Sequence, residues 1–296
     1  MSIKKWLLFT LVVFVGTFVS ASSYSFAAVV KQDPIFVTIA PQFFIIKSLI
    51  GEEHPVQVLL REGQSPHHFE VSPKTAVALS SSLAYFTIGL PLEKNVFGKS
   101  SKEIPYFKMD RGIKKIKNKE HAHHHDEGDH QGHHEAEDPH IWSSFENLIL
   151  ITDNSAQDLI QLFPAEEKKI TANKIKLIAE IKEAKELATK KLSACQSKLF
   201  FTTHASLAYL TKELGLTEKA LQEEGKSFSP SKLKQFFDEI KKHQAKVFLY
   251  RKGLDDVTKE KIATEIKMVF YPFNPIEENV VDNLSRFVQL FSENCH

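Results

Sequence analysis

An amphipathic stretch of 29 residues, from 165 to 193, is the longest regular pattern in this chain of 296 residues. Its apolar residues recur at intervals of three and four, as on one face of a helix, and lysine and glutamate fill the other positions. Pro164 stands just before the stretch, and proline is well tolerated at a helix start. A helix of this length spans about 43 Å. The apolar face consists of Ile170, Leu177, Ile178, Ile181, Ala184, Ala188 and Leu192.

Strand-like and helix-like stretches alternate on both sides of this predicted helix. Runs rich in β-branched and aromatic residues predict strands at 34–40, 54–60, 83–89, 104–110, 198–203, 246–251 and 267–271. Helices are expected at 41–50, 72–82, 92–99, 205–214, 230–244, 255–266 and 276–291. Strands that alternate with helices favour parallel sheets. The expected fold class is therefore α/β, with two Rossmann-like lobes, each a mostly parallel sheet flanked by helices, joined by one long rigid helix.

The first residues have the composition of an export signal. Lys4 and Lys5 precede an apolar run over 6–19, and small residues follow up to Ala27. The run is shorter than the roughly 20 residues of a membrane span, so a cleaved signal peptide over 1–27 is favoured over an uncleaved anchor. No cysteine lies near the cleavage point, which predicts a periplasmic protein without a lipid anchor. The predicted domains are an N-terminal lobe at 28–163, a linking helix at 164–194 and a C-terminal lobe at 195–296.

Charge and cysteine content limit the possible partners and the redox compartment. Without residues 1–27 the chain carries 36 basic and 37 acidic residues, so it has no overall basic field and nucleic acid is not an expected partner. The two cysteines, Cys195 and Cys295, are expected to form a disulfide in an oxidising compartment. The alternative is two free thiols.

Seven of the 14 histidines lie in a short acidic tract inside the predicted loop 118–138. Neutral imidazole binds zinc, copper and nickel, so the tract predicts an auxiliary metal-binding loop that gathers ions in several weaker sites. The alternative is a solvated polar loop without metal. The histidines are His121, His123, His124, His125, His130, His133 and His134.

Three further histidines follow predicted strands or lie in short loops: His67, His140 and His204. The carboxyl ends of strands in an open α/β sheet face the ligand crevice. Each histidine alone fits an ordinary core or surface position. Because they share this topological position in both halves of the chain, we expect them to converge between the lobes.

These segments resemble the periplasmic solute-binding proteins of zinc and manganese ABC importers (the metal-binding cluster A-I family), and most closely their ZnuA-like zinc branch. The resemblance rests on three motifs: Pro66–Glu70 (PHHFE), Asp138–Trp142 (DPHIW), and Thr203-His204 with the following Tyr209-Leu210. It implies one tight zinc site made by His67, His140 and His204, with His68 as the rival of His67. Glu70 and Asp138 are expected to orient the imidazoles by binding the ring nitrogens that do not contact the metal. The implied partner is the membrane permease of an ABC importer, and the implied state is a monomer.

One position departs from the family pattern. Asn274 stands where the family commonly places an aspartate ligand, and an amide oxygen is a poorer zinc ligand than a carboxylate. The fourth ligand is left open between water, Glu62 and a histidine of the 121–134 tract. Three nitrogen ligands favour zinc over manganese.

Several other functions remain as alternatives to import: a periplasmic zinc buffer or storage protein, a manganese-binding importer component and a zinc hydrolase. Three histidines and a water also describe a catalytic zinc site. However, the chain contains neither an H-E-x-x-H nor a G-x-S-x-G motif, and Val71 follows Glu70 where the inverted motif needs histidine. We therefore expect that the protein is not an enzyme.

Overall fold

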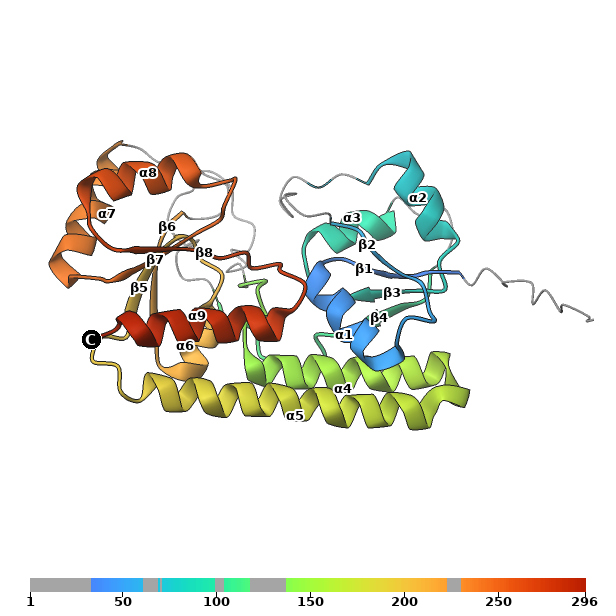
Figure 1. Cartoon of the computed structure of the whole chain (residues 1–296). Coiled ribbons are helices and arrows are strands. Elements are labelled where there is room, and N and C mark those ends of the chain that lie inside the picture. The colour runs from blue at the N-terminus through green and yellow to red at the C-terminus, as the bar shows by residue number, and fades with distance from the viewer. Residues whose placement is uncertain (1–32, 61–68, 70, 99–103, 118–136, 223–229) are drawn as a thin grey trace, which may run out of the picture. The chain divides into compact units, whose positions relative to one another are not determined.

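The computed structural model describes residues 33–60, 69, 71–98, 104–117, 137–222 and 230–296. They belong to one compact unit that spans residues 32–296. The predicted signal peptide lies outside the described residues. Two four-stranded parallel sheets, each with helices packed around it, form the framework of this unit (Figure 1).

The first sheet has the strand order β2-β1-β3-β4, and every pair of neighbours is parallel. β1 and β3 are buried throughout, as expected for apolar strands covered on both faces. The strands are β1 (Ile35–Val37), β2 (Val56–Val58), β3 (Ala84–Thr87) and β4 (Tyr106–Lys108). The helices of this lobe are α1 (Ala40–Ile50), α2 (Pro73–Ser80) and α3 (Leu92–Gly98).

The second sheet repeats this arrangement with the order β6-β5-β7-β8, again with all neighbours parallel. Its strands are β5 (Leu199–His204), β6 (Thr217–Gln222), β7 (Val247–Tyr250) and β8 (Val269–Pro272). Its helices are α6 (Ala208–Leu214), α7 (Pro230–His243), α8 (Asp256–Glu265) and α9 (Val280–Asn294). Gly215 ends α6 in a left-handed conformation, for which glycine has no steric penalty. The predicted fold class is confirmed.

Two helices connect the sheets. α4 (Phe145–Leu162) and α5 (Glu167–Leu192) run side by side (Figure 1). α5 also packs against α1 of the first lobe and against α6 and α9 of the second. It starts two residues later than the sequence predicts because a 3-10 turn, Pro164–Glu166, precedes it. Neither α4 nor β6 was predicted from the sequence.

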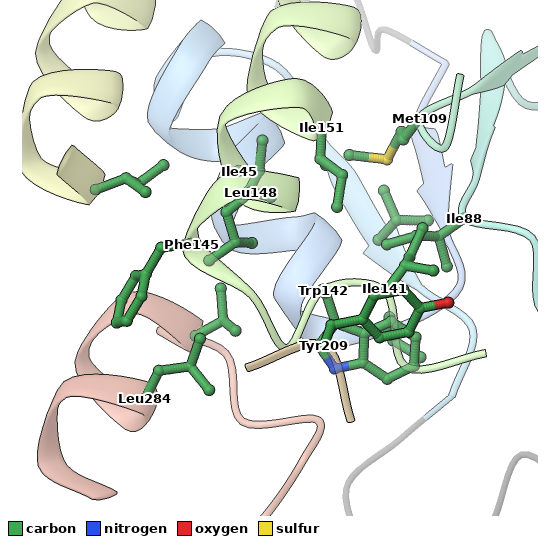
Figure 2. Packing of buried hydrophobic residues seen from close by; sticks show 14 of the residues in the cluster. Ile45, Ile88, Met109, Ile141, Trp142, Phe145, Leu148, Ile151, Tyr209 and Leu284 are labelled. Carbon is green, nitrogen blue, oxygen red and sulfur yellow. The ribbon is translucent and has the colours of Figure 1, made fainter. Parts of the chain in front are cut away.

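The main hydrophobic core is continuous from the first sheet through α4 and α5 to α9. Figure 2 shows its central part, where Phe145 and Leu148 lie between Ile45 of α1 and Leu284 of α9, and Trp142 lies beside Ile141 and Tyr209. A second, smaller cluster covers the other face of the second sheet and includes Phe201 and Phe248. The two lobes therefore share one core along the connecting helices.

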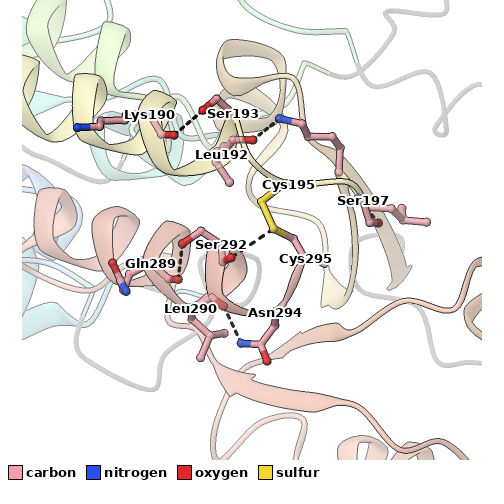
Figure 3. Close-up of a disulfide and its surroundings, with 12 residues drawn as sticks. Lys190, Leu192, Ser193, Cys195, Ser197, Gln289, Leu290, Ser292, Asn294 and Cys295 are labelled. Carbon is pink, nitrogen blue, oxygen red and sulfur yellow. Dashed lines mark hydrogen bonds between the residues drawn. A yellow bond between two sulfur atoms is a disulfide. The ribbon is translucent and has the colours of Figure 1, made fainter.

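A disulfide joins Cys195 to Cys295, with the two Cα atoms 5.2 Å apart (Figure 3). It links the segment between α5 and β5 to the residue after α9, and Ser197 donates a backbone hydrogen bond to the Cys295 carbonyl oxygen. The predicted cysteine pair is confirmed. Among the described helices, none is both long enough and apolar enough to cross a bilayer.

Candidate metal site

His140 lies in the short segment before α4, and hydrogen bonding to the Asp138 carboxylate fixes the orientation of its imidazole. The Oδ1 atom of Asp138 accepts the backbone N–H of His140 at 2.8 Å and lies 3.0 Å from the ring Nδ1. An ionised carboxylate only accepts hydrogen bonds, so Nδ1 carries the proton and Nε2 keeps its lone pair. Both side chains are buried. The pair therefore presents one imidazole in the tautomer that binds a metal through Nε2.

His204 is the last residue of β5 and comes from the other lobe. Its ring centroid lies 5.3 Å from that of His140, with the ring planes at 78°. The two residues are only 6% and 7% exposed. The fold thus brings together two histidines that are far apart in the sequence, at the edge where parallel strands expose their carboxyl ends.

The other expected site residues lie outside the described residues: His67, His68, Glu70, Glu62 and the tract His121–His134. Within the described part of the chain, no group of three or more histidine, cysteine, aspartate or glutamate side chains is arranged to hold a metal ion. The described residues therefore include two of the three expected histidine ligands, His140 and His204. They also include Asp138, one of the two carboxylates expected to orient the imidazoles.

Two aromatic side chains fix the surroundings of His140 and connect the lobes. The ring centroids of Trp142 and His140 lie 5.4 Å apart, and the Trp142 indole N–H donates to the Pro275 carbonyl oxygen at 2.7 Å. The Tyr209 hydroxyl donates to the Asp138 carbonyl oxygen at 2.8 Å and accepts the Ile116 backbone N–H at 3.1 Å. Burial raises the pKa of Tyr209 to about 12, so this hydroxyl remains a donor at neutral pH.

Asn274 uses its polar groups within its own turn. Its side-chain oxygen accepts the backbone N–H of Ile276 at 3.1 Å, and its carbonyl oxygen accepts a hydrogen bond from the Asn283 side chain at 2.8 Å. The amide oxygen is therefore already engaged in the turn that follows β8.

Glu218, on β6, is a residue near the site that sequence reasoning missed. Its two carboxylate oxygens accept the backbone N–H groups of Ser206 and Leu207, both at 3.1 Å. Ser206 and Leu207 lie two and three residues after His204, the last residue of β5. No motif points to Glu218, because the strand that carries it is itself too polar to be predicted.

Residues 35–296 match the family described as zinc-uptake complex component A, periplasmic. The chain belongs to this family. The resemblance inferred from the three sequence motifs is thereby confirmed. The family is described as a periplasmic component of a zinc-uptake complex.

Curated relatives of this ZnuA-family chain are identical to it at about a quarter of the aligned positions. The zinc-binding protein AdcA of Streptococcus pyogenes is 24% identical over 258 residues, which cover 82% of this chain and 50% of AdcA. A putative metal-binding protein of Treponema pallidum is 23% identical over 287 residues, covering 94% of this chain and 90% of that protein. This chain thus spans about half the length of the zinc-binding relatives named AdcA.

Solved structures share the fold at similarly low or lower identity. A crystal structure of ZnuA superposes with a TM-score of 0.79 at 23% identity, covering 90% of this chain and all of that one. The Zn(II)-bound ZnuA-like domain of Streptococcus pneumoniae AdcA gives a TM-score of 0.74 at 17% identity, covering 89% and 99%. At these identities the superpositions establish the fold.

Proposed function

We propose that this protein captures zinc in the periplasm and delivers it to the membrane permease of an ABC importer. The observation that carries the proposal is the approach of His140 and His204 from the two lobes, with rings 5.3 Å apart. Membership of a zinc-uptake family supports the choice of metal and of partner. Zinc is the cargo in this proposal and binds reversibly.

The proposed ligand set is His140, His204 and His67, with His68 as the alternative to His67. In the sequence, His67 lies nine residues after the end of β2, which pairs with β1 in the first sheet. Three neutral imidazoles suit zinc better than manganese, which prefers oxygen ligands. Glu70 is proposed to orient the third imidazole as Asp138 orients that of His140.

The histidine tract is proposed to collect zinc and pass it to this site. The segments that flank it are anchored close to His140. Lys117 and Glu137 form an antiparallel bridge, and the Asp138 backbone N–H donates to the Ile116 carbonyl oxygen at 2.8 Å. An ion bound by the tract is therefore tethered to the segment that carries the proposed site, which raises its effective concentration there.

The remaining proposals concern maturation and organisation. We propose that residues 1–27 are removed on export without lipid attachment, and that the mature protein is a monomer with lobes at 28–163 and 195–296. The linking segment 164–194 contains α5, whose contacts with helices of both lobes support a fixed connection between them.

The metal site is tested by titrating the mature, zinc-free protein with zinc, manganese and copper against a competing chelator. We expect one tight zinc site that is lost in His140→Ala and in His204→Ala, with weaker tract sites retained. His243→Ala is the matched control, since His243 lies on α7 beside Glu239. Tight zinc binding by both site variants would overturn the proposed site.

Delivery is tested separately from binding. Zinc uptake is measured in cells that lack the protein and receive the wild-type gene or the His140→Ala gene, with and without the permease. Uptake that needs both His140 and the permease supports import. Retention of zinc in the periplasm that is independent of the permease would identify a zinc buffer.

A further inference from the structure

Glu218 is a carboxylate near the proposed zinc site that no ligand motif includes. The residue as a whole is partly exposed, but burial of its carboxyl group raises its pKa to about 7. The hydrogen bonds from the backbone N–H groups of Ser206 and Leu207 act to lower this pKa, and the negative charge of Asp138 acts to raise it. Both hydrogen bonds, at 3.1 Å, place the carboxyl group against the backbone two and three residues after His204, close enough to Asp138 for the two charges to interact.

A negative charge at Glu218 matters for zinc binding because the proposed site is positively charged when zinc is bound. A zinc ion held by neutral imidazoles keeps two positive charges, and an uncompensated charge in a buried site is costly. Asp138 compensates one of them through its contact with His140. Asn274, at the position where the family commonly supplies a carboxylate, is neutral, and its amide oxygen binds the Ile276 N–H. Glu218 is a further carboxylate close to this segment, because its oxygens bind the backbone shortly after His204 and its charge interacts with that of Asp138.

We propose that Glu218 is ionised when zinc binds, because the charge of the ion favours the carboxylate, and that it then supplies the second negative charge of the site and strengthens zinc binding through space, without being a ligand. Its two oxygens are held by the backbone N–H groups of Ser206 and Leu207, two and three residues after His204. This anchoring keeps the charge at a fixed place while the imidazoles bind the ion. The inference rests on the proposed function, because it assumes a zinc site at His140 and His204.

The charge and the shape of Glu218 can be separated by two conservative variants. Glu218→Gln keeps the length of the side chain and removes its charge, whereas Glu218→Asp keeps the charge and shortens the side chain. Glu213→Gln is the matched control. Glu213 is also a buried carboxylate of the same lobe, but it receives a hydrogen bond from Ser144 and pairs with Lys185.

Zinc affinity is measured by chelator competition on the full mature protein, together with thermal unfolding of the zinc-free form. We expect Glu218→Gln to weaken zinc binding by about 10-fold or more, the lower end of the range for residues that support metal ligands. Glu218→Asp should retain most of the affinity, and Glu213→Gln should bind as the wild type does. A purely structural role predicts the opposite order, with the longer glutamine tolerated better than aspartate.

Two outcomes would overturn the inference: wild-type affinity in Glu218→Gln, or equal losses in the glutamine and aspartate variants. Either result would leave the proposed function intact, provided that the wild type binds zinc tightly and His140→Ala does not. Failure of the proposed function has a different signature, because the tight site would then be absent from the wild type or unaffected by His140→Ala.

Discussion

Among single residues, two buried carboxyl groups of this chain serve different purposes. Asp138 accepts two N–H groups of His140 and thereby fixes the imidazole. Glu93 accepts the Thr38 hydroxyl and the backbone N–H groups of Ile88 and Gly89 at the end of β3. Burial raises the pKa of Glu93 to about 7, against the lowering effect of these hydrogen bonds. Glu93 is therefore close to half protonated at neutral pH.

The raised pKa of Glu93 predicts how stability depends on pH. The folded state binds this proton more tightly than the unfolded chain, in which the pKa is near 4.5. The stabilising contribution is complete below pH 4.5 and is lost as pH rises through 7. Glu93→Gln should remove this part of the pH dependence, about 3 kcal/mol at most. Urea unfolding of the zinc-free protein at several pH values measures it.

The control for this experiment is Glu260→Gln, which changes an exposed glutamate of α8. It should leave the pH dependence of the free energy of unfolding unchanged. If Glu93→Gln also left it unchanged, Glu93 would have to be ionised in the folded protein throughout this range, and its burial would not be the dominant influence on its pKa.

At the level of secondary structure, the residue that caps the start of α4 also makes a contact between the lobes. The Ser144 hydroxyl accepts the Asn147 backbone N–H at 3.2 Å and donates to the Glu213 carboxylate of α6 at 2.7 Å. Ser72 caps α2 in a similar way, accepting the Thr75 N–H at 3.1 Å, but it is exposed and binds no residue of the other lobe among its described contacts. α4 directly follows the segment that holds His140, so its start also defines where that segment ends.

Comparing the two serines separates helix capping alone, at Ser72, from capping combined with a hydrogen bond to the other lobe, at Ser144. Ser72→Ala should cost about 1 kcal/mol of unfolding free energy, the usual value for an N-cap. Ser144→Ala should cost about 2–3 kcal/mol, because it also leaves the buried Glu213 carboxylate short of a donor. Urea unfolding of both variants checks the difference, and equal losses would show that the contact with Glu213 adds nothing.

For the whole molecule, stability and metal binding are expected to depend on opposite ends of the second sheet. The disulfide lies before the start of β5, whereas His204 is the last residue of that strand. Around the proposed site the lobes are joined by the Tyr209–Asp138 and Trp142–Pro275 hydrogen bonds and by the core along α4 and α5. These links favour small movements of the lobes over wide opening.

This separation predicts that the disulfide can be removed without loss of the metal site. The double variant Cys195→Ser, Cys295→Ser should lose about 2–5 kcal/mol of unfolding free energy, since the bond closes a loop with a sequence separation of 100. Its zinc affinity at a temperature where it remains folded should match the wild type. Thermal unfolding and chelator competition measure the two effects, and a large loss of affinity would show that the ends of the sheet are coupled.

Local patterns in the sequence were sufficient for most of the fold. The alternation of strand and helix, the long helix α5 and the cysteine pair were all predicted, because side-chain periodicity and the presence of only two cysteines are properties of the chain itself. α4 was not predicted, although its buried residues recur at helical spacing. The motif at Asp138–Trp142 identified the segment that carries His140.

Only the tertiary structure decided the features that depend on contacts between distant residues. The polar segment 217–222 is a strand because it pairs with β5 along its length, and propensity alone would not place it there. The distance between His140 and His204 follows from the packing of two lobes on α4 and α5. The position of Glu218 likewise depends on that packing. Local periodicity determines which elements form, whereas burial of one shared core determines which side chains meet.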